Sequence, residues 1–254
     1  MGKHLAIELS DLGAIFSLMQ DGKVRDQHQL IFKSAQVASI REELSDFLAS
    51  KEQLKGTSFD EITLAWSNER STLVPSGIFS ESNPKAMFSL CFGSKQAECE
   101  VDYNRISELS AVNIYEVPLW IKSFFVIRFP RIMIQHAGSH LVRKVLDENT
   151  FKLKATIFLQ QDYFLMTLVR HNNLEFYSFF DAHSAEDIVY HLMFALQQKE
   201  LTNEKGSVEL IQGIGVATEL VEDIRQALGK IQDLKKMHVA LIQDYLPKAQ
   251  LLCV

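Results

Sequence analysis

Two glycines separated by one residue, Gly213 and Gly215, lie between a predicted short strand (residues 208–211) and a predicted helix. Glycine in such a turn lets the backbone lie flat against a nucleotide base, and the N-terminus of the following helix favours anions. The turn is therefore a candidate nucleotide contact, although any tight connection from a strand to a helix uses the same residues. Thr218 occupies the position of the third glycine in a dinucleotide-binding fingerprint, so that fingerprint is incomplete.

Other constellations of reactive residues are incomplete. His136 and His140 are spaced i, i+4 and could share a helix face as metal ligands, but the sequence offers no third ligand nearby. A two-metal nuclease needs a cluster of carboxylates, and Glu8 with Glu69 is too few. No Gly-x-Ser-x-Gly elbow occurs, and the cysteines have no recognisable histidine partner. We therefore expect no catalytic residue and no metal site.

Composition excludes several classes of protein. The chain has 254 residues, 47% of them hydrophobic and 23% charged, which is ordinary for a globular protein with a sizeable core. The net charge of −6 provides no basic field for nucleic acid or anionic lipid. The sequence has no long apolar span, no signal-peptide pattern and only three cysteines, so a reducing cytoplasm is the expected location. We expect a protein partner, and neither nucleic acid nor membrane.

The elements that position the glycine turn form one supersecondary unit from residue 151 to residue 228. Apolar runs at 152–159, 163–170 and 174–180 are separated by short polar turns, which predicts an antiparallel meander. A helix is predicted from 184 to 198, with Ser184 as N-cap and Asp187 completing a variant capping box. The short strand, the glycine turn and a second helix complete the order β-β-β-α-β-α, which is that of ribonuclease H-like domains.

The first half carries a weaker copy of this pattern. The copy has three predicted strands, an amphipathic helix and a buried strand, at residues 4–9, 14–20, 27–33, 36–50 and 61–66. Further strands, predicted at 71–74, 88–92, 98–102 and 113–117, indicate a β-rich insertion, and Asn83-Pro84 indicates the start of a helix or turn.

The rest of the chain connects and completes the two halves. Residues 119–129 form an apolar helical segment that is expected in the core and would be a partner surface if exposed. A short strand at 132–136 and a helix at 139–146 are predicted to follow, and residues 230–254 are compatible with either strand or helix.

Two tandem copies of this order predict a duplicated ribonuclease H-like fold, as in actin, hexokinase and the heat-shock chaperones. The predicted architecture is α/β, with a mixed five-stranded sheet flanked by helices in each half. The expected boundaries are residues 1–117 for the first half with its insertion, 118–150 for a connecting segment, and 151–254 for the second half.

Four short motifs occur in order along the chain: residues 71–79 (STLVPSGIF), residues 111–118 (AVNIYEVP), the phenylalanine-rich run that ends at Phe129-Pro130 with His136 beyond it, and residues 185–190 (AEDIVY). Together they resemble a bacterial family catalogued as domain of unknown function 3822. The resemblance covers nearly the whole chain and implies an actin-like ATPase fold, with no established activity.

An actin-like ATPase uses the first hairpin of each half as a phosphate loop, which the resemblance allows us to test in this sequence. Glu8 is placed to be the carboxylate that handles Mg²⁺, and Asp11 and Gly13 lie in the following turn. Leu9, Ser10 and Asp11, however, occupy positions where glycine is expected, and the second hairpin (residues 157–162) has neither a strand carboxylate nor a glycine. Any residual nucleotide contact is therefore expected from residues 8–13 and 213–215.

Two functions follow from these observations. In the first, the protein is a non-catalytic binding or scaffold module built on the actin-like fold. In the alternative, it binds ATP and Mg²⁺ with weak or no hydrolysis. The missing glycines and carboxylates at both hairpins favour the first.

Overall fold

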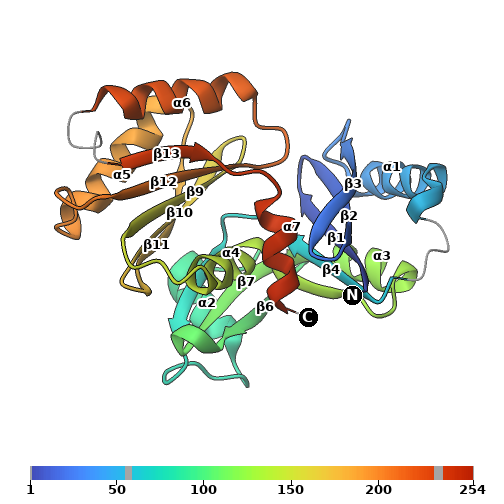
Figure 1. Cartoon of the computed structure of the whole chain (residues 1–254). Helices are drawn as coiled ribbons and strands as arrows, with labels where there is room; N and C mark the ends of the chain where they lie inside the picture. The colour runs from blue at the N-terminus through green and yellow to red at the C-terminus, as the bar shows by residue number, and fades with distance from the viewer. Residues whose placement is uncertain (1, 55–58, 232–236, 254) are drawn as a thin grey trace. The chain divides into compact units, whose positions relative to one another are not determined.

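The computed structural model describes residues 2–54, 59–231 and 237–253. The chain forms two compact units: Met1–Leu141 with Leu246–Val254 is unit 1, and Val142–Tyr245 is unit 2. Each unit is built on a five-stranded mixed sheet (Figure 1). The prediction of two mixed five-stranded sheets flanked by helices is therefore confirmed. None of the described helices is both long and apolar enough to cross a membrane.

The sheet of unit 1 has the strand order β3-β2-β1-β4-β8. Its strands are β1 (Lys3–Ser10), β2 (Gly13–Gln20), β3 (Lys23–Ile31), β4 (Glu61–Trp66) and β8 (Met133–His136). β1 pairs antiparallel with β2 and parallel with β4. Because side chains alternate along a strand, Leu5, Ile7 and Leu9 enter the hydrophobic core, whereas His4 and Glu8 lie on the opposite face. The sheet therefore has one apolar face and one polar face.

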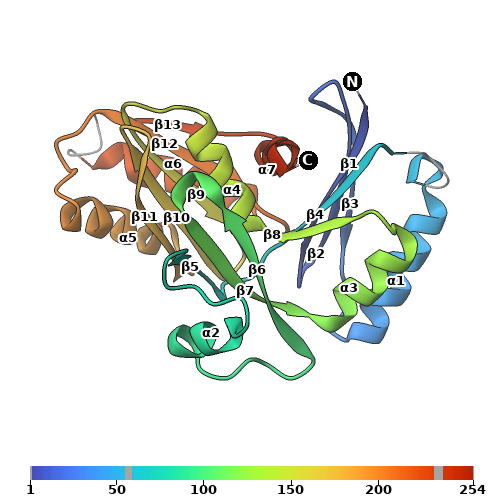
Figure 2. The ribbon, with the colours of Figure 1, turned by 90° about the horizontal axis from the view of Figure 1, so that it is seen from below.

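Two helices cover the apolar face of this sheet, α1 (Val37–Ser50) and α3 (Leu119–Arg128). Figure 2 shows them side by side on the same side of β1, β2 and β4. α1 buries Leu44 and two neighbours at helical spacing, and α3 buries Phe124 and Phe125, as predicted for a core segment. Ile127 points outward instead and is 76% exposed.

The insertion in unit 1 is a three-stranded antiparallel sheet with one helix. It consists of β5 (Ser71–Pro75), β6 (Cys99–Ile106), β7 (Ala111–Pro118) and α2 (Pro84–Phe92), with the strand order β5-β7-β6. The predicted strand at residues 88–92 is wrong, because these residues form the end of α2. Asn83 caps this helix, Pro84 starts it, and Phe88 packs its ring 4.9 Å from that of Phe92. The aromatic content that favoured a strand thus supplies an i, i+4 helical pair.

The sheet of unit 2 repeats the topology of the first, in the order β11-β10-β9-β12-β13. Its strands are β9 (Leu153–Leu159), β10 (Tyr163–Arg170), β11 (Asn173–Asp181), β12 (Gly206–Gln212) and β13 (Met237–Leu241), and its helices are α5 (Ala185–Gln198) and α6 (Thr218–Lys230). The helix α4 (Ala137–Asp147) begins in unit 1 and continues into unit 2. α5 and α6 bury their apolar stripes against one face of the sheet. The Ser184–Asp187 capping box at the start of α5 is confirmed, because the Ser184 hydroxyl accepts from the Asp187 N–H at 3.2 Å.

The end of the chain returns to unit 1 through α7 (Tyr245–Gln250), which begins at the last residue of unit 2. Gln250 is fully buried, and its Oε1 accepts a hydrogen bond from the Thr63 hydroxyl at 2.6 Å. Thr63 in turn lies 2.8 Å from His4 Nε2. β8 pairs with β4 in the first sheet, and unit 1 includes Leu246–Val254.

Candidate functional site

The β1–β2 hairpin holds three of the predicted site residues. Glu8 is buried on β1, Asp11 is exposed in the turn, and Gly13 is the first residue of β2. The Ser10 hydroxyl accepts a hydrogen bond from the Leu12 N–H at 3.2 Å. None of Asp11, Leu12 and Gly13 has a positive φ. The hairpin is thus closed by its own side chain, and the Leu12 amide that could contact a phosphate is already bonded.

The tip of this hairpin carries negative charge. Partial loss of hydration, and to a smaller extent the nearby charge of Glu69, raises the pKa of Asp11 above its ordinary value. The carboxylate is nevertheless exposed at the surface. A phosphate approaching the turn would therefore meet carboxylates and not a cradle of free amides. Within residues 2–54, 59–231 and 237–253, no three histidine, cysteine or acidic side chains are grouped as metal ligands.

In unit 2, the equivalent hairpin follows β9, and its residues account for the glycine at position 213. Gln160 is buried there, and its N–H donates to the Tyr163 carbonyl at 2.9 Å. The Gly213 N–H donates to the Leu159 carbonyl at 2.9 Å. A Cβ at Gly213 would collide with that carbonyl and with the Gln160 amide. Close packing of β12 on the end of β9 therefore accounts for a glycine at position 213.

The second predicted glycine, Gly215, is required by the conformation of the turn. It is exposed and has a φ of 78°, in the left-handed region. The Gln212 side chain spans the turn and donates to the Val216 carbonyl at 2.7 Å. α6 then begins at Thr218 with no side-chain cap. Gly213 and Gly215 thus share one turn of unit 2, as Glu8, Asp11 and Gly13 share one hairpin of unit 1.

His136 and His140, whose i, i+4 spacing left a shared helix face possible, do not lie on one helix. His136 ends β8, and its Nδ1 accepts the Gly138 N–H at 3.0 Å, so it caps α4 and is not part of it. His140 lies within α4 and is buried. A strand residue and a helix residue do not follow the 3.6-residue period, because the backbone changes conformation between them.

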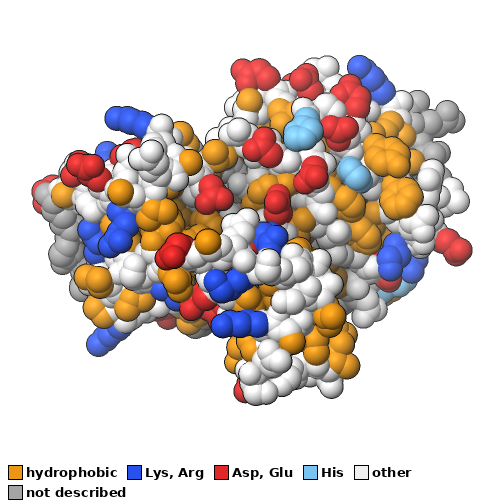
Figure 3. Space-filling view, turned by 180° about the vertical axis from the view of Figure 1, so that it is seen from behind, with side chains coloured by type: hydrophobic (Ala, Val, Ile, Leu, Met, Phe, Trp, Pro, Cys, Tyr) orange, Lys and Arg blue, Asp and Glu red, His pale blue; other side chains and the backbone are white. Residues whose placement is uncertain are grey.

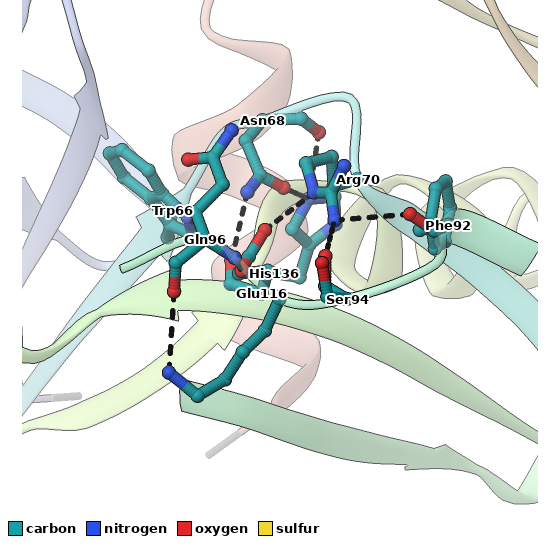
Figure 4. Close-up of polar contacts among 9 residues, drawn as sticks. Trp66, Asn68, Arg70, Phe92, Ser94, Gln96, Glu116 and His136 are labelled. Atoms are coloured by element: carbon teal, nitrogen blue, oxygen red, sulfur yellow. Dashed lines mark hydrogen bonds and ion pairs between the residues drawn. The ribbon is translucent and has the colours of Figure 1, made fainter. Parts of the chain in front are cut away.

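A buried polar cluster of unit 1 surrounds Glu116 on β7 (Figure 4). One carboxylate oxygen of this buried side chain lies 2.5 Å from Arg70 Nε, and the other accepts the N–H of Gln96. The Glu116 carbonyl accepts the side-chain N–H groups of Trp66 and Asn68, at 3.1 and 2.8 Å. Glu116 thereby connects β4, the segment between β4 and β5, β7 and the loop before β6.

Arg70 completes the same cluster. Its Nη2 donates to the Ser94 carbonyl at 2.9 Å, and its guanidinium lies 5.2 Å from the centre of the Phe88 ring. Nε and Nη2 of Arg70 are therefore both engaged by groups of the protein itself. The sequence analysis did not single out Arg70 or Glu116. The available signal was a single charged residue inside the otherwise uncharged run at residues 111–118.

His136 joins this cluster as a neutral ring. Its Nε2 lies 3.0 Å from the Asn68 carbonyl oxygen, an acceptor, so Nε2 carries the proton and Nδ1 is free to accept from Gly138. Burial lowers the pKa of His136 to about 4, partly offset by the Asn68 carbonyl. Both ring nitrogens are used within the protein, so His136 is a structural residue and not a metal ligand.

Unit 1 also has a surface cavity of about 300 Å³. It is lined by Lys3, Met19, Arg25 and Phe59 among others. Lys3 begins β1, whereas Glu8 and Asp11 lie at the other end of the strand. The cavity is therefore separate from the predicted phosphate hairpin.

The duplicated sheet topology defines an actin-like ATPase fold. The chain is similar to a Bacteroides thetaiotaomicron protein with an actin-like ATPase fold and unknown function, at 17% identity over 99% of this chain and 96% of that one, with a TM-score of 0.79. A PilM–PilN type IV pilus biogenesis complex is more distant, at 12% identity over 93% and 90%, with a TM-score of 0.48. A ROK family glucokinase from Streptomyces griseus has 9% identity over 98% and 99%, with a TM-score of 0.47.

The chain belongs to a family described as protein of unknown function (DUF3822), whose model matches residues 2–230. The resemblance drawn from the four sequence motifs is therefore confirmed. No curated protein matches the chain.

Proposed function

We propose that the protein is a non-catalytic binding or scaffold module that uses the actin-like fold to present surfaces to a protein partner. The observation that carries this proposal is the closed β1–β2 hairpin. In that hairpin the Leu12 N–H is bonded to the Ser10 hydroxyl, and the tip carries the Asp11 carboxylate. Phosphoryl transfer needs open amides, a held Mg²⁺ and charge stabilisation around the γ-phosphate, and these parts depend on one another.

The other reactive-looking groups of unit 1 support the same proposal. Arg70, the cation closest to the buried Glu116, is held by the carboxylate and by the Ser94 carbonyl. His136 uses both ring nitrogens for internal hydrogen bonds. Groups that are already paired inside the protein contribute to folding and are not available to a substrate.

Measurement of phosphate release tests the proposal. Purified wild type and Glu8→Ala are compared with ATP in the presence and absence of Mg²⁺. We expect the same background rate from both, because no group of three histidine, cysteine or acidic side chains that could hold Mg²⁺ occurs in the described part of the chain. Turnover of about 1 s⁻¹ or more that requires Mg²⁺ and disappears in Glu8→Ala would contradict the proposal.

A second candidate function is nucleotide binding without efficient hydrolysis. The turn at Gly215 favours it, because this glycine is exposed and α6 begins just after it without a side-chain cap. Thermal unfolding with and without Mg-ATP separates the two functions. Nucleotide at about 100 times its Kd adds about 2.7 kcal/mol to the free energy of unfolding. An unchanged melting temperature at millimolar Mg-ATP supports the first function.

A further inference from the structure

The surface cavity of unit 1 lies where the start of β1 meets the β2–β3 hairpin and the residue just before β4. Its volume of about 300 Å³ is at the lower end of the range found for small-molecule sites. Leu18, Met19 and Phe59 form an apolar part of the lining. Met19 is buried, and Leu18 and Phe59 pack against the hydrophobic core of the unit. The core therefore holds this apolar part in place.

The strand register brings polar side chains to the same cavity. Lys3 on β1 is paired with Gln20 on β2, and Leu5 is paired with Leu18. Directly paired residues project from the same face of a sheet, and side chains alternate along each strand. Lys3 and Gln20 therefore lie on the face of Leu5, which is the apolar face of the sheet. The cavity thus has an apolar part beside a polar rim.

A β-bulge adds a cation to this rim. The pairing of β2 with β3 shifts so that Leu18 is opposite Asp26 and Met19 is opposite Val24, which leaves Arg25 as the extra residue. A bulge redirects side chains and is common beside functional sites. Arg25 lines the cavity and forms no hydrogen bond or ion pair with a described residue. Its guanidinium is therefore available to a ligand.

The corresponding bulge of unit 2 carries the opposite charge. Leu168 is opposite Phe176 and Val169 is opposite Leu174, so Glu175 is the extra residue there. The Glu175 carboxylate lies 3.7 Å from Arg170 Nη2, in an ion pair within the hairpin. The charge at this position is thus balanced inside unit 2, whereas the repeated topology gives no internal partner to the bulge residue of unit 1.

The cavity carries an excess of positive charge. The ammonium group of Lys3, like the guanidinium of Arg25, has no ion-pair partner in the described part of the chain. Asp26 contributes a carboxylate to the lining, but its Oδ1 accepts the Gln27 N–H at 2.9 Å and its Oδ2 lies 3.2 Å from His28 Nε2. Figure 3 shows acidic side chains over much of one face of the molecule, in keeping with the net charge of −6. On such a protein, two neighbouring cations without a described partner indicate a local site for an anion.

From these observations we propose that the cavity binds a small monocarboxylate with an apolar body, such as an aryl- or alkyl-substituted short-chain acid. The carboxylate lies between Arg25 and Lys3. The planar guanidinium binds it through two parallel hydrogen bonds, and the ammonium group adds a second positive charge. The apolar body packs on the three apolar residues of the lining.

Charge selects this class of ligand over a phosphate or a nucleotide. The two cations and the Asp26 carboxylate leave one positive charge in excess, which a monoanion balances and a phosphate dianion does not. A nucleotide carries more negative charge still, and it has less apolar surface to cover Met19 and Phe59. The inference goes beyond the proposed binding of a protein partner, and it uses neither Glu8 nor the β1–β2 turn.

The test titrates the full isotope-labelled chain with phenylpropionate and follows the backbone amide signals by NMR. Three matched compounds serve as controls. Phenylpropanol has the same ring and chain without the charge, acetate has the charge without the ring, and phenyl phosphate replaces the carboxylate by a phosphate. We expect saturable shifts at residues 18–20 and 24–26, and affinities at least about tenfold weaker for each of the three controls.

Protein variants locate the binding site. Arg25→Gln and Lys3→Gln change exposed side chains, so both variants should fold, and each should weaken phenylpropionate about tenfold. Lys23→Gln removes an exposed charge from the same hairpin outside the lining and should leave the affinity unchanged. Absence of saturable binding, unchanged affinity in Arg25→Gln, or shifts confined to residues 8–13 or 213–216 overturns the inference. So does binding of phenylpropanol or phenyl phosphate as tight as that of phenylpropionate. Phosphate release by the same samples reports separately on the proposed function.

Discussion

Arg70 Nε lies 2.5 Å from Glu116 Oε2, in an ion pair whose carboxylate is almost completely buried while the guanidinium keeps partial access to solvent. The other Glu116 oxygen accepts the Gln96 N–H, and Arg70 reaches the Ser94 carbonyl. The pair thus fixes the loop that leads into β6. A charged pair in this position organises backbone from several segments, which a hydrophobic pair of the same size would leave without hydrogen-bond partners.

Removal of the buried carboxylate should strongly destabilise the protein. Glu116→Ala leaves Arg70 and the Gln96 N–H without their acceptor, and we expect a loss of about 3–5 kcal/mol in the free energy of unfolding. Urea denaturation measures this loss, and hydrogen exchange at residues 93–98 should accelerate. Glu81→Gln is the control, because Glu81 pairs with Arg105 at the surface, and it should leave stability nearly unchanged. A similar small effect in Glu116→Ala would show that the cluster has no structural role.

Stability should fall as the pH is lowered from about 6.5 toward 4. Burial lowers the pKa of His4 to about 4, whereas the unfolded chain binds a proton near pH 6.5. Between these values the unfolded state holds more protons, so acidification favours unfolding by up to about 1.4 kcal/mol per pH unit for each such histidine.

Urea titrations at pH 7, 6 and 5 check this slope. His4→Gln should flatten it. His136, which is also buried, accounts for the slope that persists in His4→Gln. An equal slope in wild type and His4→Gln would contradict the assignment of a neutral, buried His4.

Three glycine-to-alanine variants distinguish packing from ligand contact. Gly213→Ala should cost about 1–3 kcal/mol, because the new Cβ meets the Leu159 carbonyl and Gln160. Gly215→Ala should cost about 1 kcal/mol through its positive φ. Gly229→Ala, in open space on α6, should stabilise by up to about 1 kcal/mol. Thermal unfolding provides the comparison, and a Gly213→Ala protein as stable as wild type would show that position 213 has room for a side chain.

The Thr63–Gln250 hydrogen bond should anchor the end of the chain. Thr63→Val leaves the buried Gln250 Oε1 and His4 Nε2 without this partner, and we expect a cost of about 1–3 kcal/mol. Combined with Gln250→Leu, it should cost less than the sum of the single variants, with a coupling of about 1 kcal/mol. Thr167→Val is the control, because the buried Thr167 hydroxyl has no hydrogen-bond partner among the described residues. If the free-energy cost of the double variant equalled the sum of the two single costs, the Thr63–Gln250 hydrogen bond would not anchor the end of the chain.

Strong local signals in the sequence predicted much of the architecture. The meander of unit 2 follows from apolar runs separated by polar turns, and the start of α5 follows from Ser184 and Asp187. These features depend on neighbours within a few residues, so spacing and residue type specify them. Residues 88–92 show the limit of such signals, because an aromatic run fits a strand or a buried helix equally well.

The roles of the candidate residues depended on contacts between distant parts of the chain. Position 213 holds a glycine because a Cβ there would collide with Gln160. The buried carboxylate of Glu116 is paired with Arg70 and accepts the N–H of Gln96. The sequence determined that the chain would fold as two α/β units with incomplete phosphate loops, because periodicity, caps and missing glycines are local. Only the tertiary structure decided which polar groups pair, because pairing depends on the positions of atoms brought together by folding.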